Sequence, residues 1–151
     1  MEGSSAVRVC EIGYGTDEYR EECLLRDKVL REPLGLSLFD EDLTEEDSQI
    51  HFGLFSDEQK LIACAIGVPL HESLVKIRQV AVSSEVQRQG VGARLMTELE
   101  HELFRRGFRH FTLHVRLAVK GFYDALGYVQ VGSEFEEVGL PHLKMSKHLE
   151  L

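Results

Sequence analysis

The chain has 151 residues, of which 43% are hydrophobic and 28% are charged, and these proportions are ordinary for a globular protein. This length predicts a single domain over residues 1–151 with a core of its own. The formal net charge of −9 argues against a nucleic-acid partner, because a phosphate backbone requires a basic protein face. No apolar run is long enough to cross a bilayer, so no membrane partner is expected.

The cysteines and the start of the chain bear on its location. Cys10, Cys23 and Cys64 lie far apart in the sequence, and no Cys-x-x-Cys or Cys/His spacing typical of a metal site occurs. We therefore expect reduced, mostly buried thiols and no bound metal. The first residues contain no apolar run that could act as a secretion signal, which favours a cytoplasmic location.

The first elements in chain order are a strand and a helix. Alternating apolar and polar residues over 7–12 predict the strand, which begins at Val7. Thr16 is a typical N-cap residue and starts a helix with acidic residues in its first turn. Pro33 and Gly35 end this helix.

A group of three strands follows. Ile50–Phe55 and Leu61–Val68 are apolar runs joined by Ser56–Gln59, which is typical of a hairpin. Pro69 is expected to end the second strand because proline cannot donate to a ladder. The third strand covers Leu74–Val82.

The second half of the chain alternates helices with strands. An apolar residue every fourth position predicts a helix from Val91 to Leu103, with Gly107 just beyond its end. A strand over 108–115, a helix over 118–126 and strands over 128–135 and 140–145 complete the pattern. The order predicts a mixed α/β layered domain in which strands outnumber helices. It lacks the regular β-α alternation of a doubly wound dinucleotide fold.

The loop before the longest helix has the features of an anion site. Val82 ends a strand, and Gly90 and Gly92 lie where the helix begins. Free N–H groups and the positive dipole end of a helix bind phosphate, and glycines let the ligand approach them. A tight turn without a ligand is the alternative interpretation. The loop lacks the pattern of a nucleotide-hydrolysing P-loop, and Leu95 stands where a third dinucleotide-binding glycine would be.

Two motifs resemble those of the GNAT superfamily of N-acetyltransferases. Gln87-x-x-Gly90-x-Gly92 resembles its coenzyme A signature, and Gly121–Tyr128 resembles the Phe-Tyr-x-x-x-Gly-Phe block of these enzymes. The resemblance implies a mixed, mostly antiparallel sheet of about seven strands, splayed near the fourth, with about four helices. It also implies acetyl-CoA (coenzyme A) as the cofactor and direct transfer in a ternary complex. The residues expected to bind the cofactor are Val80, Ala81, Val82, Gln87, Arg88, Gln89, Gly90, Val91, Gly92 and Ala93.

Four further segments resemble the glyphosate N-acetyltransferases within this superfamily. They cover residues 26–31, 77–81, 115–123 and 139–145, whereas residues 32–40 depart from that pattern. The resemblance implies His142 as the general base and Tyr123 as the proton donor to the leaving thiolate. The residues that it assigns to the anionic group of the substrate are Arg31, Arg78 and Arg116. Individually, these arginines could also be ordinary surface charges, and Tyr123 could be a core aromatic residue.

The function that these features predict is N-acetyl transfer to a small amine bearing at least one carboxylate. A cationic acceptor such as a polyamine or aminoglycoside is an alternative, with the acidic run Asp40–Asp47 attracting it. That run is otherwise interpreted as a solvated loop or helix start. A protein amine as acceptor, and a coenzyme A-binding regulatory module without turnover, are further alternatives. A homodimer is possible because such pairing is common in the family, although no exposed apolar face stands out.

Overall fold

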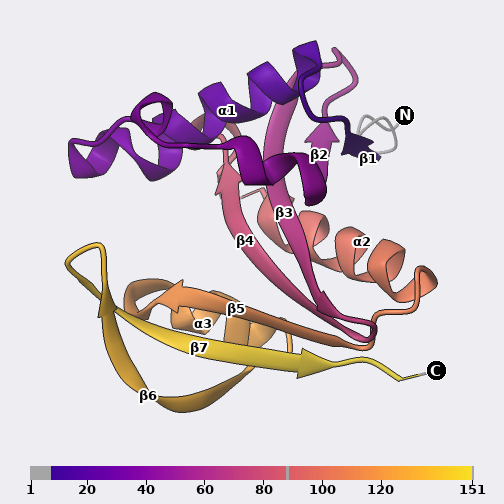
Figure 1. The fold of residues 1–151 in the computed structure, drawn as a ribbon, viewed down its shortest axis with the longest axis vertical. Coiled ribbons are helices and arrows are strands. Elements are labelled where there is room, and N and C mark those ends of the chain that lie inside the picture. Colours follow the sequence, from indigo (N-terminus) through magenta and orange to yellow (C-terminus); the bar gives the residue numbers. More distant parts are fainter. Residues whose placement is uncertain (1–7, 88, 151) are drawn as a thin grey trace. The chain divides into compact units, whose positions relative to one another are not determined.

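The computed structural model describes residues 8–87 and 89–150, so Val7 and Arg88, which the sequence placed in the first strand and the anion loop, lie outside them. Strands alternate with helices along the chain (Figure 1). The strands are β1 (Arg8–Ile12), β2 (Ile50–Phe55), β3 (Leu61–His71), β4 (Leu74–Val82), β5 (His110–Arg116), β6 (Val129–Glu137) and β7 (Leu140–His148). The α-helices are α1 (Asp17–Leu30), α2 (Val91–Arg105) and α3 (Lys120–Ala125). The 3-10 turns are η2 (Glu32–Leu34), η3 (Leu38–Asp40), η4 (Thr44–Ser48), η5 (Ser84–Val86) and η6 (Leu117–Val119).

The strands form one seven-stranded sheet in the order β1-β2-β3-β4-β5-β7-β6. β4 and β5 pair in parallel, whereas β1 with β2, β2 with β3, β5 with β7 and β6 with β7 are antiparallel. The expected mixed α/β fold is therefore confirmed, with three α-helices and short 3-10 turns among the described residues in place of about four helices. No helix in the described part of the chain has both the length and the apolar character needed to cross a membrane.

Two element boundaries differ from the sequence prediction. The prediction that Pro69 ends a strand is wrong, because β3 continues through it to His71. The ladder with β2 reaches only Gly67, opposite Ile50, so the missing N–H of Pro69 breaks no bond on that side. The helix expected over 118–126 is a 3-10 turn followed by the six-residue α3.

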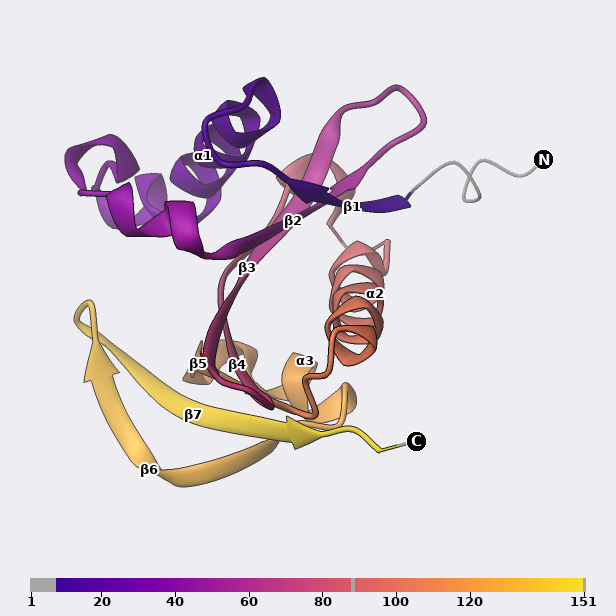
Figure 2. The ribbon, with the colours of Figure 1, turned by 45° about the vertical axis from the view of Figure 1, so that its right-hand side comes forward.

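The chain forms two compact units. The first comprises the described residues up to Gly67 together with Gln79–Leu99. In it, α1 and the start of α2 lie on opposite faces of the strands (Figure 2). One core cluster of this unit contains Ile12, Phe55, Leu61, Cys64 and Ala81, and α1 covers it with Leu25 and Val29 among others. The thiols are free as expected, with Cys23 and Cys64 buried and Cys10 half-buried.

A fully buried arginine connects three segments of the first unit. Arg26 on α1 donates from Nη1 to Glu22 Oε2 at 2.9 Å and from Nη2 to Glu46 Oε2 at 2.6 Å. Its Nε donates to Gln79 Oε1 on β4 at 3.3 Å. Glu46 belongs to η4 and is 3% exposed, so it departs from the expectation of a solvated acidic run. A buried carboxylate is stable here because it is paired with a guanidinium.

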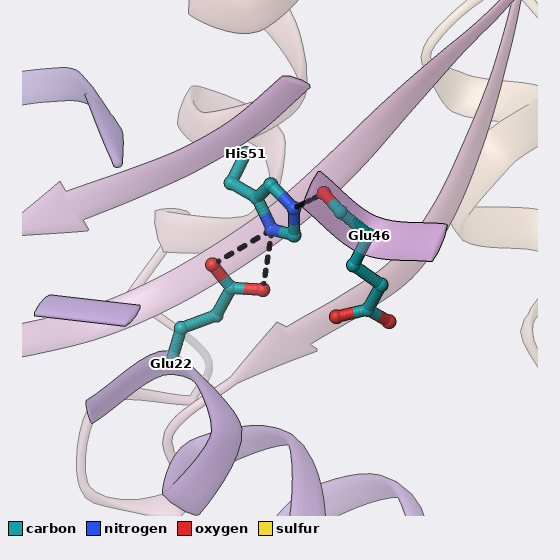
Figure 3. A group of neighbouring side chains, drawn as sticks. All are labelled: Glu22, Glu46 and His51. Carbon is teal, nitrogen blue, oxygen red and sulfur yellow. Dashed lines mark hydrogen bonds and ion pairs between the residues drawn. The ribbon is translucent and has the colours of Figure 1, made fainter. Parts of the chain in front are cut away.

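His51 completes this buried group (Figure 3). Its Nδ1 lies 2.9 Å from Glu22 Oε2, and its Nε2 lies 2.9 Å from the backbone oxygen of Glu46. Both oxygens only accept hydrogen bonds, so both ring nitrogens must carry a hydrogen and the imidazole is positively charged. Burial favours the neutral ring, but the hydrogen bond to Glu22 and its charge outweigh this effect, so the pKa of His51 is raised.

The ligand atoms of Glu22, Glu46 and His51 lie within 4.8 Å of one another, a spacing that could hold a metal ion. The cation between the two carboxylates is instead the guanidinium of Arg26. Its Nη1 donates to Glu22 Oε2 and to Glu46 Oε1, both at 2.9 Å. The group is therefore a set of two buried cations and two buried carboxylates that satisfy one another.

The second unit comprises Val68–Arg78 and the described residues from Glu100 onwards. β5 pairs with β7 from His110 opposite His148 to Arg116 opposite His142. Side chains alternate between the two faces of this ladder. The buried residues Phe111, Leu113, Val115, Leu143 and Met145 share one face, which forms the core of this unit.

We expect Arg26→Met to destabilise the protein strongly. The substitution leaves Glu22 and Glu46 buried without their cation, and breaking a buried ion pair in this way costs about 3–5 kcal/mol. Urea unfolding measures the loss. Arg20→Met, on the exposed side of the same helix, is the control and should change stability by at most about 0.5 kcal/mol. Equal losses in the two variants would contradict the role of Arg26.

The stability that His51 contributes should depend on pH. Since its pKa is raised above the ordinary value of 6.5, the contribution is complete below that value and is lost as pH rises through the raised pKa. Denaturant unfolding between pH 6 and pH 9 should show this loss in the natural protein. His51→Gln should be less stable at pH 6, and its stability should vary less over the same range. A parallel decline in both proteins would refute the charged state of His51.

Candidate functional site

The loop between β4 and α2 has the geometry of an anion cradle. Gly90 has φ +75°, a conformation that favours glycine, and a Cβ atom there would meet nothing within 4 Å. The helical ladder starts when Arg94 N–H donates to the oxygen of Gly90 at 3.0 Å. The N–H groups of Val91, Gly92 and Ala93 precede that bond, as expected for the first turn of a helix. This open helix start fits a diphosphate.

The side chains before the cradle are partly ordered by the loop itself. Ser83 accepts a hydrogen bond from Glu85 N–H, and Gln87 Nε2 donates to the oxygen of Val82 at 3.4 Å. Gln87 and Ser84 line a cavity of about 430 Å³ together with Lys28 and three residues at the end of α1 and in η2. Gln87 and Gln89 are exposed and therefore accessible to a ligand.

β4 has an irregular backbone just before the expected cofactor residues. Its ladder with β5 covers only Leu74–Lys76, although β4 continues to Val82. The N–H and C=O groups beyond Lys76 on that edge do not enter that ladder. Gln79 has φ +57°, which is strained for a residue with a side chain.

Two arginines hold the Gln79 side chain. Its Oε1 accepts from Arg26 Nε at 3.3 Å and from Arg31 Nη2 at 3.4 Å. The strain at Gln79 is therefore sustained by contacts from α1 and its C-cap residue. Sequence reasoning missed Gln79, because a glutamine within a strand pattern gives no local sign of an unusual backbone.

Tyr123 lies in α3 and is 6% exposed. Burial raises its pKa to about 12, so the phenol keeps its proton at neutral pH. Among residues 8–87 and 89–150, the structure gives Tyr123 Oη no hydrogen-bond partner. A buried hydroxyl without a partner is costly, which indicates that it has a ligand as its partner.

Neighbouring groups fix the short helix that carries Tyr123. Tyr128 donates to Glu100 Oε2 at 2.7 Å, and its ring contacts that of Tyr123 edge-on at 5.9 Å. Lys147 Nζ donates to Glu100 Oε1 at 2.8 Å and to the oxygen of Leu126 at the end of α3 at 2.6 Å. A six-residue helix is not stable alone, so these contacts orient the phenol.

His142 lies on β7 and is 5% exposed. Its Nδ1 lies 2.9 Å from the backbone oxygen of Leu140. Because a carbonyl only accepts, Nδ1 carries the hydrogen and the neutral ring has its lone pair on Nε2. That nitrogen can accept a proton, as a general base must.

Arg116 lies directly opposite His142 in the ladder of β5 and β7, so both side chains are on the same face. Arg116 is exposed, and no carboxylate of the described residues is within ion-pair distance of it. Arg78 is half-buried on β4 in the same unit and has a partner. The structure thus brings His142 and Arg116 together.

Arg31, the third arginine, belongs to the first unit. It is the C-cap residue of α1, and its guanidinium forms a forked ion pair with Glu41, with Nε–Oε2 at 2.6 Å and Nη2–Oε1 at 3.2 Å. Its charge is therefore already compensated within the protein. The sequence gave no sign of this pairing, because Glu41 belongs to an acidic run with several equivalent members.

Comparison with known proteins identifies the family. The family model for the acetyltransferase (GNAT) domain matches residues 26–149. The Bacillus subtilis (strain 168) protein YyaT is 26% identical over 111 residues, which cover 74% of each chain. A crystal structure of a Lactobacillus plantarum protein has a TM-score of 0.86 at 23% identity and covers 95% of this chain and 99% of its own. A GNAT family acetyltransferase from Elizabethkingia anophelis, solved with acetyl-CoA bound, has a TM-score of 0.70 at 17% identity, with 95% and 99% covered.

The chain therefore belongs to the GNAT acetyltransferase family and has its fold. The co-substrate of this family is acetyl-CoA. The cradle at Gly90 and the unpartnered hydroxyl of Tyr123 fit such a ligand, because one offers N–H donors to phosphates and the other a proton donor.

Gly90→Ala should weaken coenzyme A binding about tenfold or more, because the added Cβ occupies the open side of the cradle and strains a positive φ. Calorimetry with coenzyme A measures the affinity. Gly132→Ala is a matched control, since Gly132 has φ +80° and also has open space around it, but lies on β6. Its affinity for coenzyme A should equal that of the natural protein. Identical affinities in both variants would rule out the cradle as the binding site.

Proposed function

We propose that the protein transfers an acetyl group from acetyl-CoA to the amine of a small acceptor that carries at least one carboxylate. The observation that carries this proposal is the position of Arg116 opposite His142 in one ladder. A guanidinium binds a carboxylate through two parallel hydrogen bonds, and the neighbouring imidazole can take a proton from an amine. The two side chains thus match the two functional groups of an amino-acid-like acceptor.

His142 acts as the general base in this proposal. The hydrogen bond of its Nδ1 to the Leu140 oxygen keeps the lone pair on Nε2 and fixes the orientation of the ring. The imidazole titrates near neutral pH in general, so it can accept a proton from an ammonium group and release it afterwards. The amine becomes a nucleophile only after that proton is lost.

The cofactor is held by the main chain in this proposal. When bound, acetyl-CoA supplies an acetyl group activated as a thioester. N–H groups on the β4 edge beyond Lys76 are suited to polarise a carbonyl oxygen, and Tyr123 keeps its proton at Oη for a departing thiolate. The residues proposed to contact the cofactor, besides Tyr123, are Val80, Ala81, Val82, Gln87, Arg88, Gln89, Gly90, Val91, Gly92 and Ala93.

Arg31 and Arg78 are proposed to bind the acceptor together with Arg116, as in the glyphosate N-acetyltransferases that the sequence resembles. For Arg31 this requires that the acceptor compete with Glu41, its present partner at 2.6 Å. The departure of residues 32–40 from that subgroup coincides with η2 and η3, which lead to Glu41. We infer that the acceptor differs from that of the subgroup in the part that faces this segment.

A cationic acceptor is a second candidate, based on the acidic run Asp40–Asp47. Two of its carboxylates are already bound to arginines, because Glu41 pairs with Arg31 and Glu46 with Arg26. Asp40, Asp42 and Asp47 remain exposed. The run therefore offers less negative charge to a polyamine than the sequence alone suggests. A protein amine, a homodimer and a module without turnover remain the other possibilities.

A panel of amines tests the proposal, with acetyl-CoA consumption as the readout. Amino acids and related carboxylates should be acetylated in preference to polyamines and aminoglycosides. Arg116→Gln should raise KM for the preferred acceptor about tenfold or more, because a charged hydrogen-bond pair is lost, and leave KM for acetyl-CoA unchanged.

Three outcomes would overturn the proposal in different ways. Exclusive turnover of polyamines or aminoglycosides, with a KM that rises with salt, would support the acidic run as the acceptor site. Exclusive turnover of a protein amine would exclude a small acceptor. Tight coenzyme A binding without turnover of any amine would indicate a regulatory module.

A further inference from the structure

A carboxylate on β6 lies between two imidazoles of the second unit. Glu137 Oε1 is 3.0 Å from His114 Nδ1, and Glu137 Oε2 is 3.9 Å from His142 Nε2. We propose that Glu137 is a positioning residue that stabilises the protonated form of His142 during catalysis and that His114 holds Glu137 in place. This inference rests on the proposed role of His142 as the base.

The three side chains share one face of the sheet. His114 and Arg116 are two apart on β5, and Arg116 is opposite His142 on β7. Phe135 is also opposite His142, and Glu137 lies two residues further along β6. Side chains two apart on a strand, and those directly opposite in a ladder, point the same way. The backbone register therefore places these groups together.

The distance of 3.9 Å matches the task of Glu137. It is too long for a hydrogen bond, so the lone pair of the neutral His142 ring remains free to accept a proton. Once Nε2 carries that proton, the carboxylate becomes an acceptor for a charged donor. The Glu137 side chain is 45% exposed, which leaves it free to move closer.

His114 limits the movement of Glu137. It is bound to the other carboxylate oxygen, and its ring contacts Phe135 edge-on at 5.0 Å. The Phe135 ring also lies 6.1 Å from that of His142 at an interplanar angle of 31°. Phe135 therefore separates the two imidazoles, and Glu137 connects them.

The charges on this face explain why a carboxylate is needed. Arg116 from β5 and Lys144 from β7 are cations on the same face as His142, and His114 adds a third when it is protonated. Each of them disfavours a positive charge on His142. Glu136 projects to the opposite face of β6, so Glu137 is the acidic group on the described part of this face.

The proton transfer is a single step. The N–H bond of the acceptor ammonium breaks, and its proton binds to the lone pair of His142 Nε2. The electron pair of the broken bond stays on the amine nitrogen, which becomes the nucleophile. Glu137 accepts a hydrogen bond from the new Nε2–H and gains no proton.

Glu137→Gln tests the inference by two readouts. In the pH–rate profile of kcat/KM, the acidic limb should move to lower pH by about one unit, because the neutral form of His142 is favoured when the carboxylate is absent. In NMR titration of the free protein, the midpoint of the His142 imidazole should shift in the same direction by the same amount. His114→Ala should produce a smaller shift of the same sign.

Glu136→Gln, the adjacent exposed carboxylate, is the matched control and should shift neither readout. An unchanged NMR midpoint in Glu137→Gln would overturn the inference, whether or not an acceptor has been found. His142→Asn separates this result from failure of the proposed function. If that variant keeps full turnover, the proposed base is wrong, whereas a shifted midpoint in Glu137→Gln would still show that Glu137 acts on His142.

Discussion

The first unit depends on the burial of one guanidinium. Arg26 has no exposed surface, and it joins α1 to η4 through Glu46 and to β4 through Gln79. Charges in a core are tolerated only when each is compensated, so the carboxylates and His51 had to be placed together with it. This requirement fixes the unusual backbone of Gln79, which directly precedes the part of β4 assigned to the cofactor.

The second unit achieves order by register. The ladder of β5 and β7 uses one face for its core and presents His142, Arg116 and His114 on the other. The polar groups of this face are oriented by main-chain and carboxylate acceptors, so little reorganisation is needed when charge develops. Tyr123 is oriented in a different way, through contacts of Tyr128 that brace a helix too short to persist alone.

Sequence reasoning succeeded where the cause of a structure is local. The cradle at Gly90, the cap at Thr16 and the hairpin after Phe55 each depend on a few adjacent residues, and the fold class followed from their order. It failed where partners are distant. The burial of Glu46 depends on a residue 20 positions away, and Glu137 gains its position from strands that are separated in sequence. β3 passes through Pro69 because its partner strand ends earlier, which no pattern within β3 reveals.

The ion pair of Glu41 with Arg31 has a consequence for how acceptor preference could evolve. If Arg31 binds an acceptor, Glu41 is a tethered rival whose effective concentration is set by the ten intervening positions. Mutations in that connecting segment would then retune selectivity by changing how well the rival reaches its target. The residues that perform the chemistry would stay untouched, so the enzyme could diverge in diet while its reaction is conserved.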